Sequence, residues 1–526
     1  MTQITQTTQI PIGGSVRGHC EAKPAGVRMV FTMDEKRIEE IVQRVVADLR
    51  GAAGTPPAPT PASPPPAAGA AGGQPQAKPT AAGGGQGGVY PDLDSAVAAA
   101  AVAFRRLADL PLERRAALIS AMRQAALENA PILARAAWQE TGMGRPEDKT
   151  EKNLLVAERT PGPELLQARA WTGDRGLTLV ERAPYGVIGA ITPSTNPTST
   201  ILCNSIGMVS AGNAAVFNAH PSAKLCSAQT VQVLNQAIQR AGGPPDLITC
   251  PAEPTIDSAQ HLMRHPAIRL LVVTGGPGVV REAMHSGKKA ICAGPGNPPV
   301  VVDETADLEQ AARDIIKGAS FDNNVVCILE KEIIAVDAIA DQLKAIMVHR
   351  GAVEISPWQL GRLMKVIMAE DHGPGKHGVI NKAFVGKSPS VILREIGVSV
   401  SDDVRLVLAE TDADHPLVWT EQLMPVMPLV RVSSADRAID LAKAVEQGMG
   451  HTAAIHSKNL DILSRMAREM NVSIFIKNGP SLAGLGFGGE GFTSFSIASP
   501  TGEGLTSVLD FTRVRRCTLV DAFRII

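Results

Sequence analysis

The sequence predicts an α/β protein built on two parallel sheets and preceded by a long N-terminal extension. From residue 186 onward, short aliphatic runs alternate with stretches of helical periodicity, as in parallel strands joined by crossover helices. The chain has 526 residues, which is too many for one ordinary core and enough for two or three domains. Residues 51–88 are almost wholly Ala, Gly, Pro, Gln and Thr, which indicates a flexible linker ahead of the α/β part.

Composition excludes several classes of protein. The net charge is -1, whereas a nucleic-acid binder would need a basic excess. The seven cysteines are scattered and form no CxxC pair, which argues against a zinc site or a disulfide framework and favours the reducing cytoplasm. The histidines form no spaced set, so we expect no metal site. No apolar run approaches the length of a membrane span, and the first residues lack a signal peptide's apolar core.

The N-terminal extension divides into three parts. Residues 1–32 are polar and without period, so we expect disorder. Residues 33–50 carry aliphatic side chains at helical spacing and predict an amphipathic helix, whose apolar stripe is Ile38, Ile41, Val42, Val45, Val46 and Leu49. A lone helix of this length is marginal in water, so the stripe needs a partner. It could dock on its own globular domain, but the linker at 51–88 favours a separate partner.

Residues 89–298 form the first predicted α/β region. Helices are expected at 97–108, 112–129 and 130–140, followed by strand character at 177–183 within a β-hairpin near 165–185. Strands are then expected at 187–191, 214–217, 247–248 and 270–273, with helices at 199–211, 226–241, 256–265 and 278–285. Ligands bind such sheets at the carboxyl ends of the strands.

Residues 299–490 form the second region. The pattern predicts strands at 300–302, 333–336 and 453–455 and helices at 308–319, 338–348 and 460–469. The tail, residues 491–526, is β-rich around an Arg pair, and such tails often pair with another subunit.

Cys327 is the candidate nucleophile. It ends a small turn, Phe321-Asp322-Asn323-Asn324, and precedes the buried strand expected at 333–336. For an isolated cysteine, a buried structural role would be the more common one. Two further signals favour chemistry instead. Asn196 follows the strand at 187–191 and could either fix a Pro-rich turn or donate a hydrogen bond to an oxyanion. A glycine turn, Thr274-Gly275-Gly276, follows another strand and opens a helix, as phosphate-binding turns do.

Taken in order, these signals resemble the aldehyde dehydrogenase superfamily over residues 89–521. More closely, they resemble its CoA-acylating members from bacterial microcompartments, above all the propionaldehyde dehydrogenases of propanediol utilisation. The resemblance implies a Rossmann-type NAD(P)- and CoA-binding domain at 89–298 and a catalytic domain at 299–490. It also implies a small β element for oligomerisation, made from the hairpin and residues 491–526, and hence a homodimer or homotetramer.

The same resemblance assigns roles to individual residues. Cys327 would be the nucleophile and Asn196 the oxyanion donor. Glu421 would hold the nicotinamide ribose, although a helix-capping or ion-pairing acid is the alternative. The expected cofactor contacts are Thr192, Pro193, Ser194, His220, Pro221, Thr274, Gly275, Gly276, Gly294, Glu421 and Pro425. His220 and Ala223 stand where many members have the Lys and Glu that bind the adenosine ribose, so the choice between NAD and NADP stays open.

Ala293 stands where hydrolytic members carry the Glu that activates water. Alanine cannot accept a proton, so a thiol such as coenzyme A is the better nucleophile for releasing an acyl thioester. The expected reaction is therefore oxidation of a short-chain aldehyde, propanal above all, to acyl-CoA with reduction of NAD.

The resemblance also implies a location in the cytoplasm, inside the lumen of a microcompartment, with residues 33–50 binding a shell protein. Four alternatives remain. Three are enzymes: a CoA-acetylating acetaldehyde dehydrogenase of ethanolamine utilisation, a hydrolytic aldehyde dehydrogenase and a semialdehyde dehydrogenase. The fourth is a shell-associated structural protein without catalysis, against which Cys327, Asn196 and the glycine turn argue.

Overall fold

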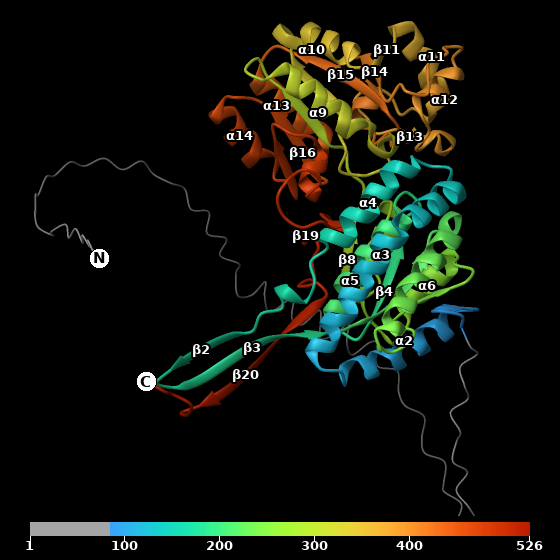
Figure 1. Ribbon diagram of the computed structural model, residues 1–526. Helices are drawn as coiled ribbons and strands as arrows, with labels where there is room; N and C mark the ends of the chain where they lie inside the picture. Colours follow the sequence, from blue (N-terminus) through green and yellow to red (C-terminus); the bar gives the residue numbers. More distant parts are fainter. Residues whose placement is uncertain (1–84) are drawn as a thin grey trace, which may run out of the picture. The chain divides into compact units, whose positions relative to one another are not determined.

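A computed structural model describes residues 85–526 of the chain (Figure 1). The leader at 1–32, the helix expected at 33–50 and nearly all of the linker at 51–88 lie outside the described residues. Among the described helices, none is long and apolar enough to cross a membrane.

The first sheet has six parallel strands in the order β1-β6-β5-β4-β7-β8. The chain order of the strands differs from their spatial order, as crossover connections require. Four of the six strands were expected, within a few residues of their observed ends. The strands are β1 (Val89–Tyr90), β4 (Val187–Thr192), β5 (Ala214–Ala219), β6 (Ile248–Pro251), β7 (Ile268–Thr274) and β8 (Ala290–Ala293).

Seven helices accompany this sheet: α2 (Leu93–Ala108), α3 (Leu112–Thr141), α4 (Pro146–Arg159), α5 (Pro197–Ser210), α6 (Lys224–Arg240), α7 (Ile256–Arg264) and α8 (Pro277–Met284). α5 packs on β4 and β5, and α3 crosses α4, α5 and α6.

The prediction of separate helices at 112–129 and 130–140 was wrong, because α3 continues through Pro131. An internal proline costs a helix about 3 kcal/mol. Buried residues on both sides of Pro131, including Ala126, Ala130 and Leu133, form one continuous face against the neighbouring helices. That packing holds the helix together.

The second sheet has seven parallel strands in the order β11-β14-β15-β10-β9-β16-β17. Its strands are β9 (Pro299–Val302), β10 (Glu332–Val336), β11 (Val353–Glu354), β14 (Val407–Glu410), β15 (Val426–Val432), β16 (Thr452–His456) and β17 (Ile474–Lys477). Its helices are α9 (Leu308–Ser320), α10 (Asp337–His349), α11 (Pro357–Ile367), α12 (Pro389–Arg394), α13 (Ala435–Glu446) and α14 (Leu460–Met470). A short hairpin, β12 (Met368–Glu370) and β13 (Val379–Ile380), lies beside α11 and α12. Sequence patterning anticipated β9, β10 and β16 and missed the other four strands.

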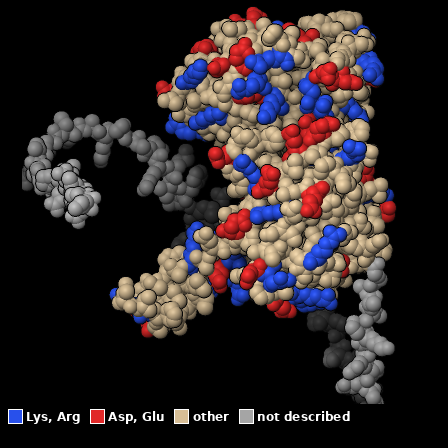
Figure 2. All heavy atoms as spheres, in the orientation of Figure 1, with Lys and Arg blue, Asp and Glu red and all other residues tan. Residues whose placement is uncertain are grey.

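A three-stranded antiparallel arm extends from the first region and is built from β2 (Arg169–Gly173), β3 (Gly176–Pro184) and β20 (Thr512–Val520). The hairpin expected near 165–185 is β2 and β3. On the face seen in Figure 2 the arm shows few charged side chains, whereas both signs of charge are interspersed over the neighbouring face. Residues 491–526 divide in two: β18 (Ile497–Ala498) and β19 (Gly504–Leu505) pack back on β8, and only β20 joins the arm.

Candidate functional site

Cys327 lies on the loop between a left-handed turn and β10, a central strand of the second sheet. Asp322, Asn323 and Asn324 all have positive φ, at 47°, 50° and 66°. Three consecutive left-handed residues are costly, and Asn and Asp tolerate this conformation best. Side-chain hydrogen bonds hold the turn: Asn323 Nδ2 donates to Gly386 O at 2.9 Å, and Asn324 Nδ2 donates to Ala319 O at 2.8 Å. Backbone strain of this kind concentrates at functional sites.

Asp322 is fully buried and is the centre of a polar cluster under the turn. Its Oδ1 accepts from the Arg145 amide at 2.7 Å, and its Oδ2 accepts from Lys149 Nζ at 3.0 Å and from Lys152 Nζ. Burial lowers the pKa of Lys152 to about 8, although Asp322 opposes that shift. Lys152 therefore remains charged at neutral pH. We call Lys149, Lys152, Asn196 and Asp322 the Lys152 cluster.

Asn196 joins this cluster from the first region. It precedes the first turn of α5, just beyond the carboxyl end of β4. Its Oδ1 accepts from Lys152 Nζ at 2.5 Å, and its Nδ2 donates to Val325 O at 3.4 Å. The two predicted catalytic residues, from sheets of different regions, thus meet at one loop.

A second polar cluster also lies near Cys327. Lys331, which is also buried, donates from Nζ to Val326 O at 3.3 Å and to Leu329 O at 3.2 Å. Glu421 Oε1 accepts from the Gly296 amide at 3.4 Å. A Cβ on Gly296 would lie 2.8 Å from His451 Cγ and 3.0 Å from Cys327 O, so only glycine fits there. We call Lys331, Glu421, Gly296 and His451 the Lys331 cluster.

Charged residues of both clusters act on the Cys327 thiol, and the lysines and Glu421 have opposing effects. Burial and the Glu421 carboxylate raise the pKa of Cys327 to about 12, whereas Lys331 and Lys152 favour its thiolate. Burial raises the pKa of Glu421 to about 7. The thiol of the ligand-free chain is therefore protonated at neutral pH, and the two lysines are the groups that assist its ionisation.

His451 is buried at the start of β16, and sequence patterning did not single it out. Burial and the nearby Lys331 charge lower its pKa to about 4, so its imidazole is neutral at pH 7. Its Nδ1 lies 2.9 Å from Thr452 Oγ1, and its Nε2 has no partner among the described residues. A neutral imidazole with a free nitrogen can accept a proton.

The expected dinucleotide contacts lie at the carboxyl ends of β4, β5 and β7. The glycine turn after β7 leads into α8, and a Cβ on exposed Gly276 or Gly278 would meet no atom within 4 Å. This open helix start fits the pyrophosphate of a dinucleotide. Thr192 Oγ1 is buried without a partner among the described residues, while Pro193 and Ser194 continue towards Asn196.

Other predicted contacts are engaged elsewhere. His220 Nδ1 lies 2.8 Å from Ser222 Oγ and caps its own turn, with Pro221 exposed beside it. Gly294 is buried, and a Cβ there would lie 3.0 Å from Pro500 Cγ, so close packing explains this glycine. Pro425 is buried just before β15. The cofactor roles of these residues stay predictions.

Ala293 ends β8 beside the glycine turn. Its carbonyl accepts from the Gly275 amide at 3.1 Å, and it pairs in register with Thr274. The position predicted to lack a water-activating base thus lies against the expected dinucleotide turn.

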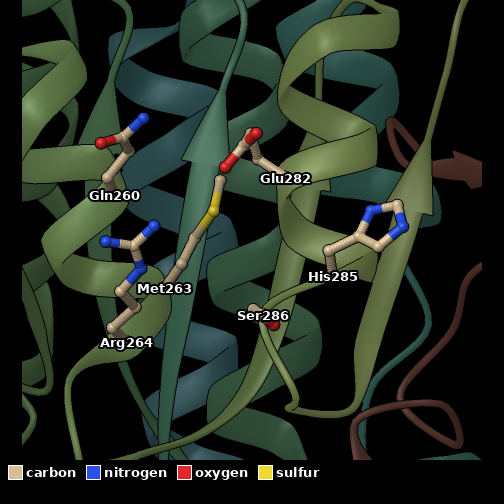
Figure 3. Close-up of a pocket in the computed structure, with 6 residues that line it drawn as sticks. All are labelled: Gln260, Met263, Arg264, Glu282, His285 and Ser286. Atoms are coloured by element: carbon tan, nitrogen blue, oxygen red, sulfur yellow. The ribbon is translucent and has the colours of Figure 1, made fainter.

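A cleft of about 300 Å³ lies between α7 and α8 and is lined by Gln260, Met263, Arg264, Glu282, His285 and Ser286 (Figure 3). These residues belong to the middle and carboxyl ends of the helices and to the loop after α8. Helices that follow parallel strands begin at the carboxyl edge of the sheet, so this cleft opens near the other edge. No predicted site residue lines it.

Within the described residues, one His and Asp group has spacing that suits a metal: Asp94, His261 and His265, whose ligand atoms lie within 4.8 Å of one another. Asp94 Oδ1 is 2.7 Å from His261 Nε2 and 3.4 Å from His265 Nε2. These side-chain contacts on the surface account for the grouping.

Sequence reasoning missed Lys149, Lys152, Lys331 and His451, and it gave Asp322 no role. The available signal was weak: α4 begins Pro-Glu-Asp-Lys-Thr-Glu-Lys-Asn, which is typical of a solvated helix face. Four of its polar residues are instead buried, namely Asp148, Lys149, Lys152 and Asn153.

Comparison with known proteins identifies the class. The sequence profile of the aldehyde dehydrogenase family matches residues 80–356 and 405–514, and the chain belongs to this family. Within it, the chain is 49% identical over 440 residues to an acetylating acetaldehyde dehydrogenase from Salmonella typhimurium, covering 84% of this chain and 94% of that protein.

Two solved structures are similarly close. A propionaldehyde dehydrogenase from Rhodopseudomonas palustris, with bound CoA and an acylated cysteine, has a TM-score of 0.81 and 47% identity, covering 84% of this chain and 99% of that one. A propionaldehyde dehydrogenase from the fucose-utilisation microcompartment of Clostridium phytofermentans has a TM-score of 0.81 and 46% identity, covering 84% and 100%. The chain is thus similar to CoA-acylating members of the family.

Proposed function

We propose that the chain oxidises a short-chain aldehyde, propanal above all, to the acyl-CoA with reduction of NAD(P). The observation that carries this proposal is the partly exposed Cys327, which lies near the charges of Lys331 and Lys152 and two residues after Val325, an acceptor of the Asn196 amide. Similarity to CoA-acylating enzymes supports the reaction class.

In the first half-reaction, the Cys327 thiolate attacks the aldehyde carbon. Asn196 Nδ2, held near the loop by its bond to Val325 O, donates to the developing oxyanion. The charges of Lys152 and Lys331 favour the thiolate. When bound, the nicotinamide cofactor supplies the hydride acceptor. The acyl group then remains on Cys327 as a thioester.

In the second half-reaction, a thiol must displace Cys327. Ala293 offers no base for water, whereas His451 Nε2 is free to accept the proton of the incoming CoA thiol. The products are acyl-CoA and the restored Cys327 thiol.

Replacing Cys327 by Ala tests the nucleophile. We expect NADH formation from propanal to be lost in a folded protein, because no covalent intermediate can form. NADH and acyl-CoA are followed with propanal and NAD, with and without CoA. Substantial turnover in the folded variant, or wild-type formation of free acid instead of acyl-CoA, would contradict the proposal.

A second candidate substrate is acetaldehyde, because the acetylating relative from Salmonella is 49% identical. Measuring kcat/KM over straight-chain aldehydes separates the two. A maximum at two carbons would replace propanal by acetaldehyde without changing the chemistry.

Residues 33–50 are proposed to hold the enzyme to a microcompartment shell protein through their aliphatic stripe. The microcompartment origin of one structural relative supports this proposal. Fusing residues 33–50 to a fluorescent protein should direct it to compartments, and Val42→Asp should abolish the targeting. A deletion of residues 1–50 that still co-purifies with compartments at the wild-type ratio would exclude this role.

The arm is proposed to form the contact of a homodimer or homotetramer. Large apolar side chains are exposed on it, among them Trp171 at 54%, Val514 at 60% and Val520 at 65%. Such exposure suits burial against another copy. Val514→Asp should lower the mass measured by light scattering.

A further inference from the structure

We propose that Lys152 is a positioning residue that aims the Asn196 amide at the Cys327 loop and ties it to the turn that carries Cys327. The inference rests on the proposed function, which gives Asn196 its role as oxyanion donor. Lys152 is buried and its hydrogen bonds go to the side chains of Asn196 and Asp322, so it would position the site through these two partners.

The first part of the argument is the orientation of an amide. An asparagine side chain can be turned over with little change in shape, which exchanges its acceptor and its donor. Lys152 Nζ can only donate, and it lies 2.5 Å from one end of the Asn196 amide. That end must be the oxygen, because a turned amide would set buried donors against each other. The Nδ2 group is thereby directed away from Lys152, and it donates to Thr195 Oγ1 at 3.2 Å and to Val325 O, two residues before Cys327.

The second part is the coupling between two regions of the chain. The same ammonium donates to Asp322, the first of the three left-handed residues, while Asn196 follows a strand of the first sheet. The Lys152 side chain therefore fixes the position of the oxyanion donor, Asn196, relative to the loop that carries Cys327. Asp322 has no room to shift towards Gly144. A Cβ built on Gly144 would already collide with the Asp322 carboxylate.

Lys149 provides a matched control on the same helix. It is equally buried and donates to the same Asp322 oxygen at 3.0 Å, but its other bond is to the backbone oxygen of Thr195, at 3.3 Å. Lys149 thus supports the turn without touching the Asn196 side chain. An effect of Lys152 beyond that of Lys149 passes either through Asn196 or through the charge that Lys152 places near the Cys327 thiolate, and the double variant with Asn196→Ala separates these two routes.

The experiment compares Lys152→Met, Lys149→Met and Asn196→Ala in the full chain with propanal, NAD and CoA. We expect Lys152→Met to lower kcat by about 10²–10³-fold, as loss of one oxyanion donor does, with KM for NAD changed less than threefold. Lys149→Met should lower kcat by less than tenfold. The double variant Lys152→Met/Asn196→Ala should be no slower than the slower single variant, because both changes remove one function.

Equal losses of kcat in Lys152→Met and Lys149→Met, or multiplied losses in the double variant, would overturn the proposal. Asn196→Asp keeps the inference testable if Lys152→Met does not fold. An aspartate at 196 would pair with the Lys152 charge but lose the donor to Val325 O, so its Tm should lie above that of Asn196→Ala while kcat falls. A Tm as low as that of Asn196→Ala would exclude the contact.

This Tm readout needs no substrate, so it separates the two proposals. If wild type made no acyl-CoA from any aldehyde, the proposed function would fail, while the Asn196→Asp measurement would still decide whether Lys152 faces residue 196.

Discussion

Two buried lysines flank the Cys327 loop, and they are held in different ways. Lys152 donates to side-chain acceptors from distant parts of the chain, Asn196 and Asp322. Lys331 donates to backbone oxygens of its own loop, at Val326 and Leu329. The first lysine can therefore orient functional groups, whereas the second closes the loop locally. Two lysines that are equally buried can thus have different roles, because the atoms that each ammonium contacts decide which groups it positions.

The charge balance differs as well. Asp322 accepts from two lysines and one backbone amide, so the Lys152 cluster satisfies its carboxylate fully. In the Lys331 cluster, burial holds the pKa of Glu421 at about 7, and its carboxylate opposes the Cys327 thiolate. Protonation of Glu421, in the Lys331 cluster, therefore changes the reactivity of the Cys327 thiol.

The largest effect is expected from Lys331→Met. Removing this ammonium leaves the buried carbonyl oxygens of Val326 and Leu329 without their donor and removes a favourable charge near Glu421, and each unsatisfied buried acceptor costs about 1–3 kcal/mol. Urea unfolding of the full chain measures the loss. Lys458→Met is the control, since Lys458 is exposed and lies 3.9 Å from Asp307, a surface pair of little worth. Equal stability of the two variants would show that Lys331 contributes no structural support.

A pH-dependent effect is expected from His451→Gln. The folded-state pKa of His451, about 4, lies below its unfolded value of 6.5, so the unfolded chain binds a proton first as pH falls. Stability is therefore lost between pH 6.5 and 4, by up to about 3 kcal/mol. His451→Gln should remove this part of the acid sensitivity, measured as unfolding free energy at pH 7 and at pH 4.5.

His456→Gln is the matched control for that variant. Burial lowers the pKa of His456 to about 4 as well, but Lys331 is not among the groups that shift it. Both variants should lose acid sensitivity, and only His451→Gln should slow transfer of the acyl group to CoA. Slowing of acyl transfer in both would remove His451 from the proposed second half-reaction.

A smaller effect is expected from Glu421→Gln. The neutral amide no longer opposes the thiolate, so the pKa of Cys327 should fall and its alkylation by iodoacetamide at pH 8 should speed up, about tenfold per pKa unit. Peptide mass spectrometry measures the rate, with exposed Cys517 as the internal reference. A slower reaction at Cys327 with unchanged Cys517 would mean that Glu421 supports the thiolate.

The smallest effect is expected from Ala293→Glu, which adds a carboxylate beside the glycine turn without touching either lysine. Some acyl-enzyme should then release free acid, because a base is available for water. The product ratio of free acid to acyl-CoA measures this shift. A folded, acylated variant that forms no detectable acid would show that a base at this position is not sufficient.

The sequence by itself determined what depends on neighbours along the chain. Alternating strands and helices, the glycine turn after β7, Asn196 after β4 and Cys327 ahead of β10 follow from local periodicity and turn chemistry. Packing decided the continuity of α3 through Pro131, because a long buried face outweighs one missing backbone hydrogen bond.

Only the tertiary structure decided which charges are buried together. Lys152 meets Asn196 across 44 residues and Asp322 across 170, and no local pattern marks a lysine that will lose its solvent. His451, the residue before β16, reaches Gly296 in the loop between β8 and β9 in the same way. A buried ion pair is stable only when both partners arrive together, so its physical cause lies in the fold and not in either segment alone.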